Sequence, residues 1–285
     1  MHPPFRLIQP DEAVTPVIVA SPHSGRHYPK AFVQASMLDQ RTIRSSEDAF
    51  MDDLVCEAPR LGAPLLLAEY PRAYLDLNRS RDELDPAVID GVTRVVTTPR
   101  INSGLGVIPR VVANGRAIYR GKLRLAEAEM RLNTIWQPYH DCLDGLMRTT
   151  HAQFGEAVVL DFHSMPHEAL DSLARPGHRR PEVVLGDRFG ASARADIVDA
   201  LEAGFFDAGL VVSRNAPFAG AYVAQRYGRP SRNWHAVQIE IDRSLYMNEQ
   251  MIRPNGNFDA VKQIVTEVLS RVIGNEGVSL PLAAE

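Results

Sequence analysis

Two histidines, His23 and His163, each stand just after an apolar run that is typical of a buried strand, in the contexts PHSG and DFHS. Open α/β sheets place their ligand sites where strands end, so both side chains are positioned to face one crevice. A zinc ion that performs hydrolysis takes three protein ligands from histidine and carboxylate side chains and leaves one position open for water. Glu47 and Asp48, at the start of the first helical stretch, are the nearest carboxylates to complete such a set.

Each histidine also has a structural interpretation. A single histidine after a strand more often caps a turn or makes a hydrogen bond than binds a metal. The constellation also lacks the fixed local spacing of a motif such as HExxH. The residues and their spacing therefore leave a metal site and a structural role open.

Glu240 lies in a strand-like run, VQIEID at residues 237–242. Alternation of side chains along a strand puts Gln238, Glu240 and Asp242 on one face. If that face lines the crevice, Glu240 is suited to act as a general base. The alternative is a solvated strand face or an ion pair with Arg243 or another arginine.

Arg79 follows the apolar run that ends at Asn78. Its planar guanidinium can bind a carboxylate with two parallel hydrogen bonds. A structural salt bridge is the alternative role for this side chain.

The composition limits the kinds of partner. The net charge is −4 and no basic run resembles a nucleic-acid footprint, so nucleic acid is not an expected partner. No apolar run approaches the roughly 18 residues of a membrane helix, and the first residues lack the layout of a signal peptide. We therefore expect a cytoplasmic protein with no membrane partner, and Cys56 and Cys142 as reduced thiols.

Several familiar catalytic motifs are missing from the sequence. It contains no complete GxGxxG pattern, no GKS or GKT triplet and no GxSxG elbow. A dinucleotide site, a phosphate-binding loop and a serine nucleophile are therefore not indicated.

Short apolar runs alternate with longer segments of helical period, which predicts an α/β domain. Strands are predicted over Val17–Ala20, Pro64–Ala68, Ala73–Leu77, Ala157–Leu160, Val183–Leu185, Leu210–Val212 and Ala236–Ile241. Helices are predicted over Ser46–Leu61, with Ser46 as its cap and Gly62 as its stop, over Lys122–Phe154 with a bend or break at Pro138, and near 190–206 and 258–272. Residues 80–118 give no clear pattern, and the tail after Gly277 is expected to fray.

Seven separated motifs, taken in order, resemble the N-formylglutamate amidohydrolase family. They are SPHSG at 21–25, EDAFMDDL at 47–54, RAYLDLNR at 72–79, LDFHSMP at 160–166, NAPFAGAY at 215–222, YGRP at 227–230 and VQIEI at 237–241. Several motifs in the right order are far more specific than any one of them. One departure is GAY at 220–222, where the family usually has GGY.

The resemblance implies one domain over residues 1–285, with a central mixed β-sheet flanked by helices. This α/β fold, of the phosphorylase/hydrolase-like kind, is similar to that of zinc carboxypeptidases and aspartoacylases. The resemblance also implies Zn²⁺, or another divalent metal, held by His23, Asp48 and His163, with Asp48 favoured over Glu47. Glu240 would be the general base and acid.

The implied activity is hydrolysis of N-formyl-L-glutamate to formate and L-glutamate, a step of histidine degradation. Asn78 and Arg79 resemble a pair that holds one substrate carboxylate. The substrate has a second carboxylate, for which Arg226, Arg229 and Arg72 are the candidate cations. Arg226 is favoured because it lies beside the motif of Tyr222, which is also expected to contact the substrate.

Other functions fit the same residues. The chain could hydrolyse another N-acyl or N-formimidoyl acidic amino acid, with or without a metal, or bind a carboxylate on the same scaffold without catalysis. The sequence does not indicate an oligomeric state.

Overall fold

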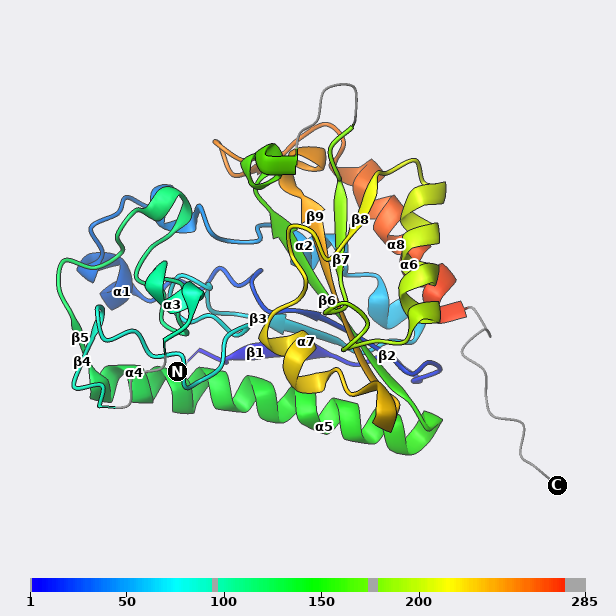
Figure 1. The fold of residues 1–285 in the computed structure, drawn as a ribbon, viewed down its shortest axis with the longest axis horizontal. Helices are drawn as coiled ribbons and strands as arrows, with labels where there is room; N and C mark the ends of the chain where they lie inside the picture. The colour runs from blue at the N-terminus through cyan, green and yellow to red at the C-terminus, as the bar shows by residue number, and fades with distance from the viewer. Residues whose placement is uncertain (1, 94–96, 174–178, 275–285) are drawn as a thin grey trace.

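The computed structural model describes residues 2–93, 97–173 and 179–274, and the predicted frayed tail lies outside these ranges. The described residues form a seven-stranded sheet in the order β1-β3-β2-β6-β9-β7-β8 (Figure 1). The strands are β1 (Phe5–Ile8), β2 (Val17–Ser21), β3 (Leu65–Ala68), β6 (Ala157–Met165), β7 (Val183–Gly186), β8 (Val212–Arg214) and β9 (Trp234–Asp242). β2, β3, β6 and β9 pair in parallel, whereas β1 and β7 join them antiparallel. This confirms the prediction of an α/β fold with a central mixed sheet.

Strands β6 and β9 lie at the centre of the sheet, and nearly all of their residues are buried. A strand covered on both faces reads as an almost continuous apolar run, as the first half of β6 does, whereas β9 alternates apolar residues with Gln238, Glu240 and Asp242. Alternate side chains supply the two halves of the core. Val158 and Leu160 pack in one hydrophobic cluster, and Ala157 and Val159 pack in the other.

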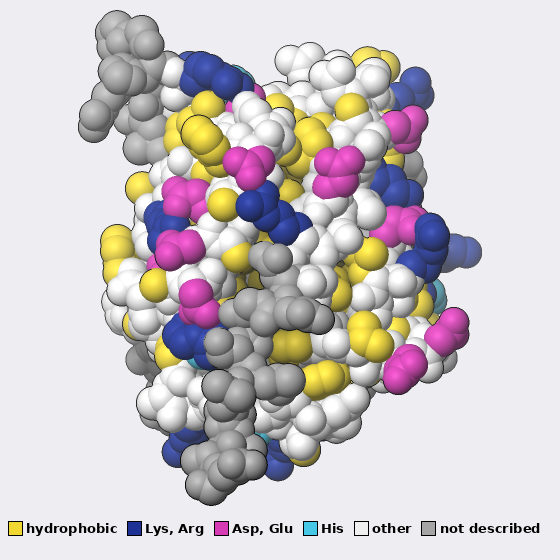
Figure 2. Space-filling model, turned by 90° about the vertical axis from the view of Figure 1, so that its right-hand side faces the viewer, with side chains coloured by type: hydrophobic (Ala, Val, Ile, Leu, Met, Phe, Trp, Pro, Cys, Tyr) yellow, Lys and Arg dark blue, Asp and Glu magenta, His cyan; other side chains and the backbone are white. Residues whose placement is uncertain are grey.

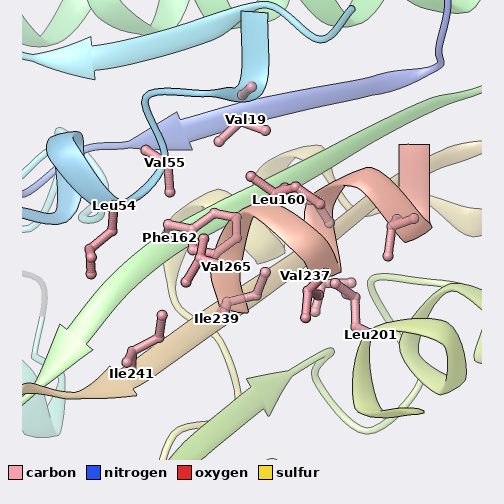
Figure 3. Packing of buried hydrophobic residues seen from close by; sticks show 14 of the residues in the cluster. Val19, Leu54, Val55, Leu160, Phe162, Leu201, Val237, Ile239, Ile241 and Val265 are labelled. Atoms are coloured by element: carbon pink, nitrogen blue, oxygen red, sulfur yellow. The ribbon is translucent and has the colours of Figure 1, made fainter. Parts of the chain in front are cut away.

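One face of the sheet is covered by α6 (Ala195–Asp207) and α8 (Phe258–Gly274). Figure 3 shows Leu160 and Ile239 of the two central strands facing Val265 of α8 and Leu201 of α6. Burial of several such side chains, each worth about 1.5–3 kcal/mol, fixes the two central strands relative to the helices. The functional residues at their ends therefore stand on a rigid base.

The opposite face is covered by a long helical stretch near the bottom of Figure 1. It consists of α4 (Leu125–Arg131), a π-helical turn (Leu132–Trp136) and α5 (Gln137–Phe154). Pro138 lies in the first turn of α5, where its missing N–H leaves a gap in the helical hydrogen bonds. The π-helical turn directly before it accommodates that gap, so the predicted irregularity at Pro138 is confirmed.

The predicted helix over Ser46–Leu61 is wrong in most of its length. The structure has only α2 (Met51–Leu54) and a 3-10 turn (Ala58–Leu61). Phe50 before α2 has a φ of 65°, and the N–H of Asp48 donates to the carbonyl of His23 at 3.1 Å. Residues 45–50 therefore leave helical geometry to bind the turn that carries His23. The predicted stop at Gly62 is confirmed, since it ends the 3-10 turn with a φ of 90°.

The predicted strand over Ala73–Leu77 is also wrong. The N–H groups of Tyr74 and Leu75 both donate to the carbonyl of Pro71, which forms turns instead of a ladder. The turns are buried in one of the two hydrophobic clusters, with Ala73 and Leu77 both at 1% exposure, which accounts for their apolar residues. A short apolar run alone does not distinguish a strand from a buried turn.

The other predicted elements are confirmed with small shifts of their ends. The largest are five residues, at the start of α6, predicted at 190, and at the end of β6, predicted at Leu160. The remaining short elements are α1 (Lys30–Ala35), α3 (Pro99–Asn102), α7 (Tyr222–Tyr227), β4 (Ile89–Asp90), β5 (Leu123–Arg124), β10 (Met247–Asn248) and β11 (Arg253–Pro254). Figure 2 shows the face that carries α6 and α8, where positive and negative side chains are interspersed among scattered hydrophobic ones. Within the described ranges, no helix has the length and apolar character needed to cross a membrane.

Candidate metal centre and active site

Three segments meet at the carboxyl ends of the central parallel strands. His23 follows β2 by two residues, His163 lies near the end of β6, and Glu240 lies opposite His163 on β9. The turn after β2 packs tightly, because a Cβ on Gly25 would lie 2.2 Å from the carbonyl oxygen of Tyr70. Strand order and this glycine turn together bring the two histidines side by side.

His23, Asp48 and His163 form a buried group whose ligand atoms all lie within 4.8 Å of one another. The two Nδ1 atoms are 3.0 Å apart, and Asp48 Oδ2 lies 3.1 Å from that of His163 and 3.5 Å from that of His23. The carboxylate of Glu47 points elsewhere, where it accepts hydrogen bonds from Arg44 and Tyr28. The structure thus groups Asp48, rather than Glu47, with the histidines.

The donor atoms of this group suit a cation. Nε2 of His23 lies 2.7 Å from Asp76 Oδ1, and Nε2 of His163 lies 2.9 Å from Asp161 Oδ2. Ionised carboxylates only accept hydrogen bonds, so each Nε2 carries the proton and each Nδ1 presents a lone pair. Two lone pairs and the oxygen of Asp48 then face one point, an arrangement that could hold a metal ion.

Three arginines interact with the carboxylates around the group. Arg243 Nη2 donates to Asp48 Oδ1 at 2.9 Å, which leaves Oδ2 facing the histidines. Burial alone would raise the pKa of Asp76, but the charges of Arg79, His23 and Arg72 hold that pKa well below its ordinary value. Asp76 is therefore ionised and can accept a hydrogen bond from Nε2 of His23.

Replacing Asp161 with Asn tests whether the carboxylate that contacts Nε2 of His163 increases the affinity for metal. We expect the affinity for zinc to fall about 10- to 100-fold, because His163 loses the carboxylate that orients its ring and increases its basicity. Competition with a chromophoric chelator measures the change. Asp187→Asn is the matched control, since Asp187 is a buried aspartate whose partner is Asn215 and not a histidine. Equal zinc affinity in the Asp161 variant and the wild type would contradict the prediction.

Glu240 is buried, at 8% exposure, beside this group. Gln238 Nε2 donates to Glu240 Oε1 at 2.8 Å, as expected for alternate residues on one strand face. Burial raises the pKa of Glu240 to about 7. A carboxyl group with a pKa near neutrality can both accept and return a proton. Neither structural alternative is seen, because the face is not solvated and Arg243 pairs with Asp48.

Asn78 and Arg79 also reach the centre. The Asn78 side chain accepts from the N–H of Val223 at 2.8 Å and donates to Gln238 Oε1 at 3.1 Å, so its amide orientation is fixed. Arg79 donates to the carbonyls of Asn78 and Leu105, and Nη2 lies 3.8 Å from Asp76. Asn78 and Arg79 are both buried at the wall of one cavity.

The cavity has a volume of about 590 Å³ and borders the group of His23, Asp48 and His163, called the metal group below, through its two histidines. Its wall includes both histidines, Glu240, Gln238, Asn78 and four arginines, namely Arg72, Arg79, Arg100 and Arg243. Negative substrates suit a cavity with this many cations.

The structure does not bring Tyr222 and Arg226 into the wall of this cavity. The Tyr222 ring lies 5.7 Å from that of Trp136 and 5.3 Å from that of His140, and the Arg226 guanidinium lies 5.5 Å from the ring centre of Tyr227. Of the three cations considered for the second carboxylate, Arg72 lines the cavity.

Sequence reasoning missed several residues of the site. Asp161 had a usable signal, because it stands two residues before His163 on the same face of a strand. Asp76 and Arg100 had none, since turns and loops distant in sequence bring them to the centre, whereas Arg243, which directly follows β9, was considered only as an ion-pair partner of Glu240.

Comparisons with known proteins agree with the motifs. The family model described as N-formylglutamate amidohydrolase matches residues 15–247. The chain is 32% identical over 242 residues to an N-formylglutamate deformylase of Pseudomonas aeruginosa, which covers 82% of this chain and 83% of that protein. A protein of the same name from Pseudomonas putida is 29% identical over 241 residues, with 82% of each chain covered.

Solved structures show the same relationship. The crystal structure of an N-formylglutamate amidohydrolase from Ralstonia eutropha JMP134 matches with a TM-score of 0.89 and 34% identity, and covers 95% of this chain and 97% of that chain. A gene product of Agrobacterium tumefaciens matches with a TM-score of 0.69 at 18% identity over 96% of this chain and 94% of that chain, which shows a shared fold.

Proposed function

The chain belongs to the N-formylglutamate amidohydrolase family, and we propose that it hydrolyses N-formyl-L-glutamate to formate and L-glutamate. The observation that carries the proposal is that His23, His163 and Glu240 line one cavity with four arginines, and that both histidines are grouped with the buried Asp48. The names of the relatives support the choice of formyl as the acyl group and of glutamate as the amino acid of the substrate.

We propose Zn²⁺ as the metal, held by His23, Asp48 and His163. Two imidazoles, one carboxylate and an open position are a donor set found in zinc hydrolases, and the lone pairs described above fit it. When bound, the ion would act as a Lewis acid and lower the pKa of water from about 15.7 to about 7.

The side chains of the protein then supply the proton transfers. Glu240 accepts a proton from the attacking water, whose oxygen adds to the formyl carbon. The carbon–nitrogen bond breaks, and Glu240 returns the proton to the leaving nitrogen, so the products are formate and the amine of glutamate.

Two donors are placed to stabilise the negative charge that develops on the formyl oxygen. Arg72 lines the cavity with its Nη2 2.9 Å from Asp76 Oδ2. Burial alone would lower the pKa of Arg72, but the charges of Asp76, Asp48 and Glu240 raise it, so the side chain stays cationic. Asn78 presents a fixed amide next to His163. We propose that Arg79 binds the α-carboxylate of the substrate.

Rates of acyl-group release on a panel of substrates test the proposed function. N-formyl-L-glutamate should be turned over faster than N-acetyl-L-glutamate, N-formimidoyl-L-glutamate and N-formyl-L-aspartate. Faster turnover of one of the others would assign a different acyl group or amino acid. Binding of all four compounds without turnover of any would indicate a carboxylate-binding protein instead of an enzyme.

A further inference from the structure

Arg100 differs from the other three arginines of the cavity in having no partner within the described ranges. Arg72 pairs with Asp76, and Arg243 is held by Asp48 and Ser164. Arg79 donates to two backbone carbonyls. Arg100 lines the same cavity, is half-buried, and makes no side-chain hydrogen bond or ion pair with a residue that the structure describes.

The backbone that carries Arg100 is well fixed. Thr98 caps α3 by accepting from the N–H of Ile101, whose side chain is buried. The N–H of Leu105 donates to the carbonyl of Arg100 at 2.8 Å, and the carbonyl of Leu105 accepts from Arg79 Nε at 3.0 Å. The segment is thus bound directly to Arg79, so that only the Arg100 side chain remains free to meet a ligand.

Arg79 and Arg100 line the same cavity, and Leu105 links them by its two backbone hydrogen bonds. Burial is the main cause that lowers the pKa of Arg79, and the charges of Arg72 and Arg100 add to the effect. Two like charges that face one cavity repel in the free protein and attract an anion between them. A ligand with two separated carboxylates relieves that repulsion.

We propose that Arg100 binds the side-chain carboxylate of the substrate and selects dicarboxylic N-acyl amino acids. The inference rests on the proposed function, in which Arg79 takes the α-carboxylate and Arg72 faces the reacting group. It replaces the expectation that Arg226 has this role, because Arg226 lies outside the cavity wall against the ring of Tyr227.

Kinetics on a charged and a neutral substrate of nearly equal shape test the proposal. Release of formate from N-formyl-L-glutamate and N-formyl-L-glutamine is measured for the wild type and for Arg100→Gln, Arg100→Lys, Arg116→Gln and Arg226→Gln. Arg116 is the matched control, since it is an exposed arginine of the segment after α3 that contacts Thr42 and is absent from the cavity wall.

Arg100→Gln should lower kcat/KM for the glutamate substrate about 10- to 100-fold, mainly through KM, because a charge-assisted hydrogen bond is lost. The value for the glutamine substrate should change little, and Arg100→Lys should retain part of the preference. Equal losses on both substrates, an unchanged preference, or loss of preference in Arg226→Gln instead would overturn the assignment.

A binding measurement separates this inference from the proposed function. If the wild type releases no formate from either substrate, the proposed function fails, and the same variants are compared by the rise in unfolding temperature that each compound causes. Greater stabilisation by the glutamate compound that disappears only in Arg100→Gln would still support Arg100. Equal stabilisation in all five proteins would reject it.

Discussion

Removal of bound metal is expected to lower formate release from N-formyl-L-glutamate by at least about 10³-fold, and addition of zinc is expected to restore it. A Lewis acid contributes several kcal/mol to such a reaction, and each 1.36 kcal/mol corresponds to about a factor of ten in rate. The test measures the metal content and the rate before chelation, after chelation and after zinc is returned. A chelated protein that holds no metal and keeps its full rate would remove the proposed role of zinc.

Two histidine variants test whether the metal that supports turnover is bound by the predicted ligands. His163→Ala should lose both metal and turnover, because it removes one of three donors whose atoms lie within 4.8 Å of one another. His151→Ala should keep both, since His151 lies on α5 beside Trp234 and away from the metal group. Zinc should also raise the unfolding temperature of the wild type and not that of His163→Ala, because only the wild type has the complete site.

The centre of the fold was predictable because its strands are buried on both faces. The runs that begin at Val17 and Ala157 are almost wholly apolar, the run that begins at Ala236 alternates apolar and polar residues, and the structure places all three in neighbouring parallel strands. The polar residues that follow or end these strands then meet at one edge of the sheet. This explains why His23, His163 and Glu240 could be named as candidates from their positions, while their roles came from the family resemblance.

The segments between the strands were harder to predict because their geometry depends on distant partners. Residues 45–50 have the period of a helix, yet the hydrogen bond from Asp48 to the carbonyl of His23 draws them into an irregular path. The apolar residues around Leu75 are buried in turns that begin at Pro71. Local propensity was overruled in both places by contacts that hold the site together.

The arginines of the cavity were also hard to predict from the sequence. Arg226 stands beside a family motif in the sequence, but its helix directs it to Tyr227. Arg100 belongs to a stretch with no periodic signal, and reaches the cavity because its segment hydrogen-bonds to Arg79 through Leu105. Sequence proximity to a motif therefore does not identify the cations that line the cavity.

Glu240→Gln is expected to lower kcat by about 10² to 10⁴-fold while the protein still binds zinc and substrate. The amide has nearly the same shape as the carboxylate and can still accept the hydrogen bond from Gln238, so the cavity should keep its structure. It cannot take a proton from water. Asp242→Asn is the control on the same strand face, because Asp242 contacts His167 and Ser244 and not the cavity.

The pH profile distinguishes loss of a base from a general disturbance of the site. Burial raises the pKa of Glu240 to about 7, and only the ionised carboxylate can accept a proton, so wild-type turnover should fall as the pH is lowered through that value. The residual turnover of Glu240→Gln should lack this fall. Full activity in Glu240→Gln, or an unchanged profile at reduced rate, would mean that another group moves the proton.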